Sequence, residues 1–400
     1  MLKEYKIKEL GDIATGNTPS KKNKEFYDSK DIMFIKPDDI DEDIKELSSS
    51  KEYISFIAKE KSRIIPKNTL MVTCIGSIGK IAINKEESAF NQQINAIVPN
   101  DKIFSSKYLA YVIMNNKEKL KAIANAPVVP IINKTQFSEF KVYIHDDLGV
   151  QKKIVDILDK AQKLINKRKL QIEELDLLVK SKFIEMFGDP INNPMKWEVK
   201  KMKDISVNIM SGNTPKGGEQ VYVESGIMFL RSQNVWKNKL LLDDVAYIDQ
   251  STHNKMKKSS LKNKDILMTK TGRINTENSS LGRAAMFLGE DDSANINGHV
   301  YLIRLKEQII NEFVLYILTS KEYRGYIRSV CVGGIDKRQL NKEHIEDFPI
   351  IFPPIEKQKK FVSYVKQVDK LKFEMEKSLK ELEDNFNSLM QKAFKGEILI

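Results

Sequence analysis

The chain has 400 residues, of which 41% are hydrophobic and 30% charged, so it should be a globular protein of two to three domains and not a disordered or fibrous chain. Lysine and arginine number 66 against 55 acidic residues, and the formal net charge of +11, spread evenly along the chain, favours a polyanionic partner. With two cysteines, four scattered histidines and no apolar run near the roughly 18 residues of a membrane span, we expect no disulfide framework, no metal site, no membrane segment and a soluble cytoplasmic protein.

The first part of the chain, residues 1–147, is predicted to contain short strands and turns followed by an amphipathic helix. A Gly-Asn-Thr-Pro turn at Gly16–Pro19 precedes an apolar strand at Ile32–Ile35. A second strand, Leu70–Thr73, leads into a glycine loop. The helix is expected at about 106–124, and together these elements predict one mixed domain.

One long helix is predicted over residues 148–187. Its apolar residues are spaced alternately by four and three, which is the pattern of a heptad seam. The seam consists of Ile154, Leu158, Ala161, Ile165, Ile172, Leu175, Val179 and Met186, with Arg168 and Lys182 on the same stripe. Glycine and proline at Gly188 and Pro190 end the helix, so residues 188–196 should form a linker.

The same plan then returns in residues 197–355. The turn reappears unchanged at Gly212–Pro215, the strands at Ile227–Leu230 and Leu267–Thr269, and the amphipathic helix at about 312–328. A second long helix follows at 356–396. Its seam consists of Phe361, Val365, Val368, Lys372, Met375, Leu379, Leu382, Phe386, Leu389 and Ala393. Such an order of matching elements indicates a tandem duplication.

The expected fold is therefore α+β, with two tandem-repeated mixed α/β domains, each followed by a long helix. A narrow seam cannot be buried by one helix alone, so the two helices should pair as an antiparallel coiled coil. Ile154 should then lie near Ala393, and Met186 near Phe361. Arg168 and Lys372 should bend outward, because an unpaired buried charge costs several kcal/mol.

This arrangement resembles the specificity subunits of type I restriction–modification systems. The matching features are the repeated turn, the strand ending in Lys36 or Arg231 followed by Asp38-Asp39-Ile40 or Gln233-Asn234-Val235, the Phe-Gly-Asp-Pro linker with its Asn-Pro and Trp, and Pro353-Pro354-Ile355 ahead of Gln358. The first copy departs from the pattern, because His145-Asp146-Asp147 stands where prolines would be expected, and its helix should start less rigidly.

The resemblance implies two target-recognition domains that read the two parts of a split site in double-stranded DNA. It also implies that the paired helices hold the domains apart, set the spacing between the two half-sites and dock methyltransferase subunits, with restriction/translocase subunits joining through the complex. The chain itself would carry no catalytic site and no cofactor.

Candidate DNA-binding residues lie in the repeated turns and at the strand ends. Small hydroxyls and lysines in the turns suit close approach to phosphates. At the strand ends, arginine can read guanine, and glutamine or asparagine can read adenine, whereas the alternative is a salt bridge at the rim. These candidates are Thr18, Ser20, Lys21, Lys22, Lys36, Thr214, Lys216, Arg231, Gln233 and Asn234.

Further candidates follow the glycine loops and a basic run. The run from Lys255 to Arg283 carries far more cations than acids and could follow the DNA backbone. Amides after the glycine loops could read bases, although hydrogen bonding within the core is equally open. These candidates are Asn91, Gln92, Gln93, Lys134, Lys257, Lys258, Lys270, Arg273, Arg283, Asn297, His299 and Lys337.

The alternative is a single-chain DNA methyltransferase or nuclease with its own catalytic site. Gly76-Ser77-Ile78-Gly79-Lys80 lacks the full spacing of a phosphate loop. The acids of Pro37–Lys45 resemble a nuclease motif, but the second copy has none at Ser232–Lys237. Asn193-Pro194-Met195 lacks the second proline and the aromatic residue of the adenine-methyltransferase loop, so catalysis is expected to come from partner subunits.

Overall fold

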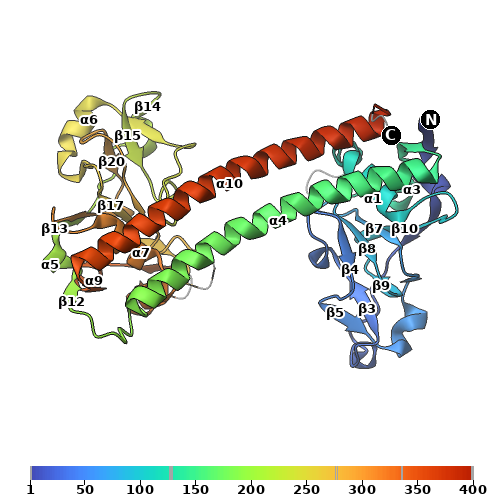
Figure 1. Ribbon diagram of the computed structural model, residues 1–400, viewed down its shortest axis with the longest axis horizontal. Coiled ribbons are helices and arrows are strands. Elements are labelled where there is room, and N and C mark those ends of the chain that lie inside the picture. The colour runs from blue at the N-terminus through green and yellow to red at the C-terminus, as the bar shows by residue number, and fades with distance from the viewer. Residues whose placement is uncertain (1, 126–128, 275, 277, 335–336, 398–400) are drawn as a thin grey trace. The chain divides into compact units, whose positions relative to one another are not determined.

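The computed structural model describes residues 2–125, 129–274, 276, 278–334 and 337–397, which form two compact units (Figure 1). Unit 1 contains Met1–Gln171 and Met375–Ile400, and unit 2 contains Ile172–Glu374. Each unit therefore combines one mixed domain with part of each long helix, α4 (Leu148–Phe187) and α10 (Ile355–Lys395). None of the helices in these described ranges is both long and apolar enough to cross a lipid bilayer.

Unit 1 is built on two main sheets. Within its described residues, a five-stranded sheet has the order β2 (Gly11–Thr15), β10 (Ile94–Pro99), β7 (Leu70–Thr73), β8 (Ile81–Asn84) and β4 (Lys45–Leu47). A four-stranded sheet has the order β5 (Glu52–Ile54), β3 (Ile32–Ile35), β9 (Ser88–Phe90) and β6 (Ile64–Ile65), and β1 (Leu2–Lys6) pairs with β11 (Lys141–His145). The short helices are η1 (Ile7–Glu9), η2 (Lys24–Phe26), η3 (Pro37–Asp39), η4 (Phe56–Lys61), α1 (Ser106–Asn115), α2 (Lys117–Ala122) and α3 (Lys134–Glu139).

Unit 2 repeats this plan. In the part of it that the structure describes, one four-stranded sheet has the order β13 (Ser206–Ser211), β21 (Val300–Leu305), β17 (Ile266–Thr269) and β19 (Ala284–Met286), and another the order β14 (Tyr222–Val223), β16 (Ala246–Ile248), β15 (Ile227–Leu230) and β20 (Ala294–Ile296). Smaller sheets join β18 (Thr271–Gly272), β23 (Arg338–Gln339) and β22 (Val332–Gly333), and β12 (Val199–Lys201) with β24 (Pro349–Ile351). The short helices are α5 (Met202–Ile205), η5 (Gly218–Val221), α6 (Gln250–Lys255), η6 (Lys257–Ser259), α7 (Asn311–Thr319), α8 (Lys321–Val330) and α9 (Lys342–Glu346).

The duplication extends to strand pairing. β3 runs parallel to β9 in unit 1, and β15 runs parallel to β20 in unit 2. In each of these two sheets, the other strand pairs among the described residues are antiparallel. All four residues of β3 and of β7 are buried, which is why these strands are short continuous apolar runs without alternation. The two tandem mixed domains predicted from the sequence are confirmed.

Each predicted amphipathic helix is in fact two helices. In unit 1, Asn116 lies between α1 and α2 with a non-helical backbone (φ −103°, ψ 11°). In unit 2, Ser320 separates α7 from α8, and its side chain accepts a hydrogen bond from the backbone of Tyr323. A serine in this position caps a new helix more readily than it continues an old one. The prediction of single helices was therefore wrong at these two points.

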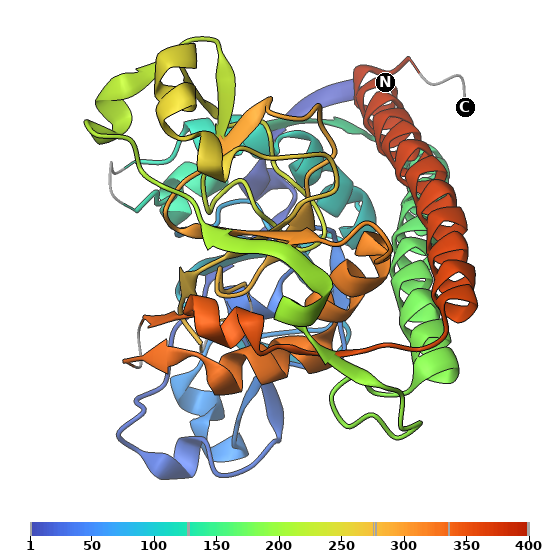
Figure 2. The same cartoon turned by 90° about the vertical axis from the view of Figure 1, so that its left-hand side faces the viewer.

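The long helices run antiparallel in both units (Figure 2). In unit 1, Ile154 and Leu158, near the start of α4, share a hydrophobic cluster with Met390 and Ala393, near the end of α10. In unit 2, the end of α4 meets the start of α10, where Phe187 and Phe361 have ring centroids 5.7 Å apart. The predicted antiparallel pairing is confirmed.

Phenylalanines fill the C-terminal end of the α4 seam. The heptad pattern assigns Lys182 and Met186 to the stripe, but Phe183 and Phe187 are the buried residues, at 1% and 0% exposure. A straight helix has 3.6 residues per turn, so a stripe that follows a strict 3.5-residue repeat rotates around the helix by about 20° per heptad. The buried residues therefore follow one another at intervals of four here, from Val179 to Phe183 and Phe187. Lys182 instead forms an ion pair of 2.7 Å with Glu185.

Two charged residues of the seams, Lys372 and Arg168, have polar partners. Lys372 forms an ion pair with Asp176 on the other helix at 2.7 Å. Arg168 donates to the amide oxygen of Gln171 at 3.2 Å. Both residues are partly exposed and each has a polar partner, so neither charge is buried and unpaired.

A buried glutamine anchors the start of each long helix. Gln151 donates to the carbonyl oxygens of His145 (2.8 Å) and Ile103 (3.0 Å). Gln358 donates to the carbonyl oxygen of Pro353 at 2.7 Å. In the first copy, which lacks the prolines, the side chain of Asp147 also accepts from the backbone of Val150, so hydrogen bonds fix a helix start that the sequence predicts to be looser.

The aromatic cluster around Phe361 should dominate the stability of unit 2. Phe361→Ala removes ring contacts with Phe183, Phe187, Phe313 and Tyr316, and truncating a buried phenylalanine costs about 3–5 kcal/mol. Denaturant unfolding should show this loss of stability. Phe373→Ala on the same helix is the matched control, because that side chain is 65% exposed and should change the free energy of unfolding by less than about 0.5 kcal/mol. Equal effects of the two substitutions would contradict the proposed packing.

Candidate nucleic-acid interface

The repeated Gly-Asn-Thr-Pro turn needs its glycine in both units. A Cβ on Gly16 would lie 2.3 Å from the carbonyl oxygens of Phe90 and Asn91, and a Cβ on Gly212 would lie 2.1 Å from that of Ile296. Only glycine allows this approach of two backbones. The turn is thereby held against the loop after β9 or β20, which carries the predicted amides.

These loops bring some predicted residues together. In unit 1, the exposed Thr18 donates to the side chain of Gln92 at 2.7 Å. Asn91 is 5% exposed and accepts from the backbone of Gln93, and Asn297 accepts from the backbone of His299 in the same way. The two asparagines therefore shape the loops, and the outward side chains are Gln92 and His299.

The strand-end turns share one internal brace. Asp39 accepts a hydrogen bond from the backbone of Lys36 at 2.9 Å, and Asn234 accepts from the backbone of Arg231 at 2.8 Å. Asn234 is 1% exposed, and its amide also donates to the carbonyl oxygens of Leu241 and Asp244. Asn234 therefore cannot reach a base, which corrects its assignment as a base-reading candidate.

The cation that ends each strand is paired with a carboxylate and lies near an aromatic ring. In unit 1, Lys36 forms an ion pair with Glu52, and its ammonium lies 5.6 Å from the centre of the Phe34 ring. In unit 2, Arg231 lies 3.0 Å from the carboxylate of Asp244 and 5.9 Å from the centre of the Tyr222 ring. Both cations are partly buried, with side chains 24% and 16% exposed.

These contacts keep both carboxylates charged. The hydrogen bond from Lys36 lowers the pKa of Glu52 below its ordinary value. The hydrogen bond from Gln233, and then the charge of Arg231, lower the pKa of Asp244. Each strand end therefore presents a fixed pair of opposite charges at neutral pH.

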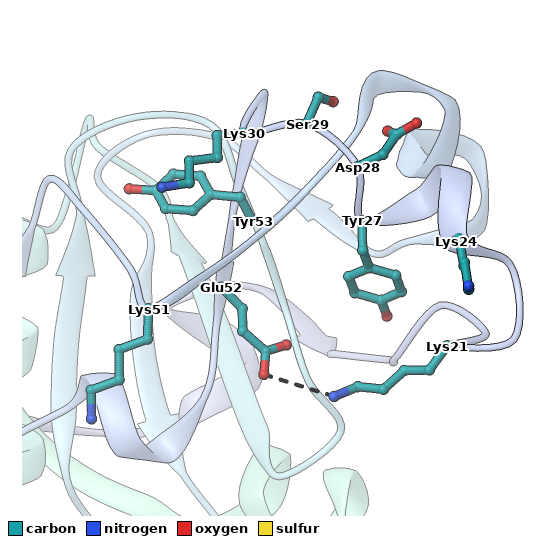
Figure 3. A pocket seen from close by; sticks show the side chains of 9 residues that line it. All are labelled: Lys21, Lys24, Tyr27, Asp28, Ser29, Lys30, Lys51, Glu52 and Tyr53. Carbon is teal, nitrogen blue, oxygen red and sulfur yellow. Dashed lines mark ion pairs between the residues drawn. The ribbon is translucent and has the colours of Figure 1, made fainter.

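A basic pocket of about 680 Å³ lies beside the ion pair of Lys36 and Glu52 in unit 1, and Glu52 is one of its lining residues (Figure 3). We call it the lysine pocket, and its lining residues are Lys21, Lys24, Tyr27, Asp28, Ser29, Lys30, Lys51, Glu52 and Tyr53. Figure 3 shows the ammonium of Lys21 directed at Glu52, at a distance of 3.7 Å. Four lysines against two acids leave the pocket positive, and its tyrosines provide faces on which bases or sugars can pack.

The basic run in unit 2 is divided between surface and interior. Lys257, Lys258 and Arg273 are exposed. Arg283 is 8% exposed, lies 3.7 Å from the centre of the Trp236 ring and donates to the carbonyl oxygens of Asn278 and Ser279. It holds its own loop, which corrects its assignment to a phosphate-contacting surface.

The remaining candidates are not among the residues that line the lysine pocket. Ser20, Lys22, Lys134, Thr214, Lys216 and Lys337 are exposed or partly exposed. Lys270 lies 5.7 Å from the centre of the Tyr301 ring.

Sequence reasoning missed the carboxylates and the tyrosines of these sites. Glu52 faces Lys36 only because β5 pairs with β3, and β5 is too short to stand out in the sequence. Tyr27 and Tyr222 precede their strands at matching places, and each packs against the phenylalanine of that strand. That correspondence is visible in the sequence and could have identified them.

The chain is similar to known proteins along most of its length. A family model, the type I restriction modification DNA specificity domain, matches residues 2–174 and 194–384. The chain is 27% identical over 425 residues to the type I restriction enzyme MjaIX specificity subunit of Methanocaldococcus jannaschii, covering 99% of this chain and 93% of the relative. It is 30% identical over 175 residues to the EcoR124I/EcoR124II specificity subunit of Escherichia coli, covering 41% and 42%.

Solved structures agree with the fold. The type I restriction–modification S subunit of M. genitalium has a TM-score of 0.53 at 15% identity and covers 98% of this chain and 96% of its own. A chain from a structural study of complex assembly and conformational transition in a type I system has a TM-score of 0.63 at 16% identity, covering 99% and 98%. Because the family model matches two stretches that together span most of the sequence, the chain belongs to the family of the type I restriction modification DNA specificity domain.

Proposed function

We propose that this chain is the sequence-reading subunit of a type I restriction–modification complex. Residues 1–147 and 197–355 act as target-recognition domains, each reading one half of a bipartite site in double-stranded DNA. The observation that carries this proposal is the duplicated strand end, where Lys36 or Arg231 is fixed at the same place on the same scaffold. Duplicated readers with different side chains suit a target whose two halves differ.

The proposal assigns catalysis to partner subunits. The residues that most resemble a catalytic loop are already engaged within unit 1. Thr73 donates to the carbonyl oxygen of Ser77 inside the glycine loop, and Lys80 lies 3.6 Å from Glu42 and 3.4 Å from the carbonyl oxygen of Ile40. These contacts favour a structural loop over the alternative of a methyltransferase or nuclease site in this chain.

The paired helices also present apolar side chains for partner subunits. Leu164 on α4 is 54% exposed in unit 1, and Leu371 on α10 is 47% exposed in unit 2. The two leucines occupy the same position in the repeat, ten residues after Ile154 and Phe361. We propose that each contacts one methyltransferase subunit, and that restriction subunits join through the resulting complex.

Exchange of one domain tests bipartite reading. Residues 1–147 are replaced by the equivalent part of a related specificity subunit, and DNA methylation is profiled in cells that also express the methyltransferase subunit. One half of the methylated motif should change and the other should stay the same, because the two domains belong to different compact units. A change in both halves would contradict independent reading, and methylation without any bipartite motif would overturn the proposed function.

The lysine pocket should contribute affinity without sequence preference. Lys24→Ala with Lys30→Ala should weaken duplex binding at every sequence and lower the slope of log K against log salt by about 1 for each DNA phosphate that is no longer neutralised. The exposed pair Lys102→Ala with Lys119→Ala, outside the pocket, is the charge-matched control. Identical salt slopes for the two double variants would show that the lysine pocket does not contact DNA.

The exposed leucines should govern partner assembly. Leu164→Asp should weaken binding of one methyltransferase subunit by roughly ten-fold or more, because a buried leucine contributes about 1.5–3 kcal/mol. Light scattering of the assembled complex should then show one methyltransferase subunit fewer, and two fewer with Leu371→Asp added. Leu242→Asp, at a side chain 53% exposed outside the helices, is the control and should assemble normally. Full assembly of the double variant would refute this docking surface.

A further inference from the structure

A single carboxylate organises the end of β15. The Oδ1 atom of Asp244 accepts from Nη2 of Arg231 at 3.0 Å, and its Oδ2 atom accepts from Nε2 of Gln233 at 3.0 Å. Its main-chain oxygen accepts from the same arginine nitrogen at 3.1 Å and from Asn234 at 2.8 Å. Asp244 therefore fixes two donor side chains through its carboxylate and the turn beneath them through its backbone.

The cluster of Asp244, Gln233 and Arg231 is exposed on one side and buried on the other. The Asp244 side chain is 78% exposed and Gln233 is exposed, whereas the Arg231 side chain is only 16% exposed. Both hydrogen bonds of the guanidinium use Nη2, and Nε is buried without a hydrogen-bond partner among the described residues. A buried donor without a partner is rare in folded proteins, and here the guanidinium is held by the two hydrogen bonds of Nη2 with Asp244.

The hydrogen-bonding groups of this cluster indicate which bases it would contact. A fixed arginine can donate to O6 or N7 of guanine, and glutamine can pair with N6 and N7 of adenine. Both hydrogens of Arg231 Nη2 are taken by Asp244, so Nη1 is the nitrogen left to donate to a base, and the same carboxylate holds Gln233 beside it. The ion pair restricts the arginine in advance, so less conformational entropy is lost on binding.

We propose that Asp244 is a specificity-determining residue, which holds Arg231 and Gln233 as one reader of neighbouring base pairs in the major groove, including one G·C pair. This inference rests on the proposed function and assigns the G·C pair to the half-site of the second domain. Asp244 itself acts as a positioning residue. Its carboxylate would repel phosphates, which places it toward base edges and away from the DNA backbone.

Unit 1 holds the matching place with different chemistry. Glu52 binds two lysines, Lys21 and Lys36, and Asp38 stands where Gln233 stands in unit 2. Lysine is a flexible point charge without the planar guanidinium group of arginine. The backbone hydrogen bond beneath is the same in both units. Glu52→Gln, which removes the carboxylate charge in unit 1, is therefore the matched control for Asp244→Asn.

Methylation profiling tests the inference with the full chain and its methyltransferase subunit. Asp244→Asn and Arg231→Lys should each relax the motif at one G·C position in one half-site, with the other half unchanged. Glu52→Gln should leave that position unaltered and act only on the opposite half. An unaltered motif in both Asp244→Asn and Arg231→Lys would overturn the inference while the bipartite motif still supports the proposed function.

Duplex binding provides the second measurement if Asp244→Asn gives no methylation. The parental complex should bind its own motif roughly ten-fold or more tightly than a duplex changed at that G·C pair, as expected for a specific contact to one base pair. With Asp244→Asn this ratio should fall toward one, while binding to unrelated duplex is retained or strengthened because a negative charge has been removed. A ratio equal to the parental value would overturn the inference. Absence of any bipartite preference in the parental complex would instead count against the proposed function.

Discussion

Neither long helix can bury its apolar seam alone, and this constraint determines how both units are built. Each seam is a narrow stripe on a helix that is otherwise charged, so it is stable only where another apolar surface covers it. In unit 1 the cover comes from the other helix and from α1, through ring pairs such as Tyr111 with Phe386. In unit 2 it comes from α7, where Phe313 and Tyr316 pack against Phe183. The helices are thus part of each domain core as well as partners of one another.

The duplicated domains keep their interior and vary their exterior. Gly16 and Gly212, Asp39 and Asn234, and Gln151 and Gln358 perform the same structural task in the two copies. The replacement of Asp39 by Asn234 is informative, because both side chains accept the same backbone hydrogen bond although one is charged. Side chains above this brace are under no such constraint. A recognition surface can therefore change without disturbing the backbone that presents it.

The sequence was sufficient for the repeat, the long helices and their antiparallel pairing, because period and spacing are properties of the chain itself. Prediction from the sequence failed for residues whose exposure and contacts depend on neighbours distant in sequence. The hydrogen bonds that bury Asn234 and the Trp236 ring that covers Arg283 come from the fold. The roles of Glu52 and Asp244 likewise depend on strand pairing and turns that place them beside Lys36 and Arg231. Phe183 and Phe187 were missed for a different reason, because a strict heptad ignores the drift of a straight helix.

Unit 1 is assembled from residues at both ends of the chain, and this affects how the protein can fold during synthesis. Phe386, Met390, Ala393 and Phe394 belong to the same hydrophobic cluster as Leu70, Val72 and Tyr108. A ribosome that has completed residues 1–171 has therefore made an unfinished core, which must wait through the whole of unit 2 before its last side chains arrive. Contacts of such large sequence separation slow folding, because the intervening loop must close first. The N-terminal domain, although synthesised first, should be the later of the two to reach its native state.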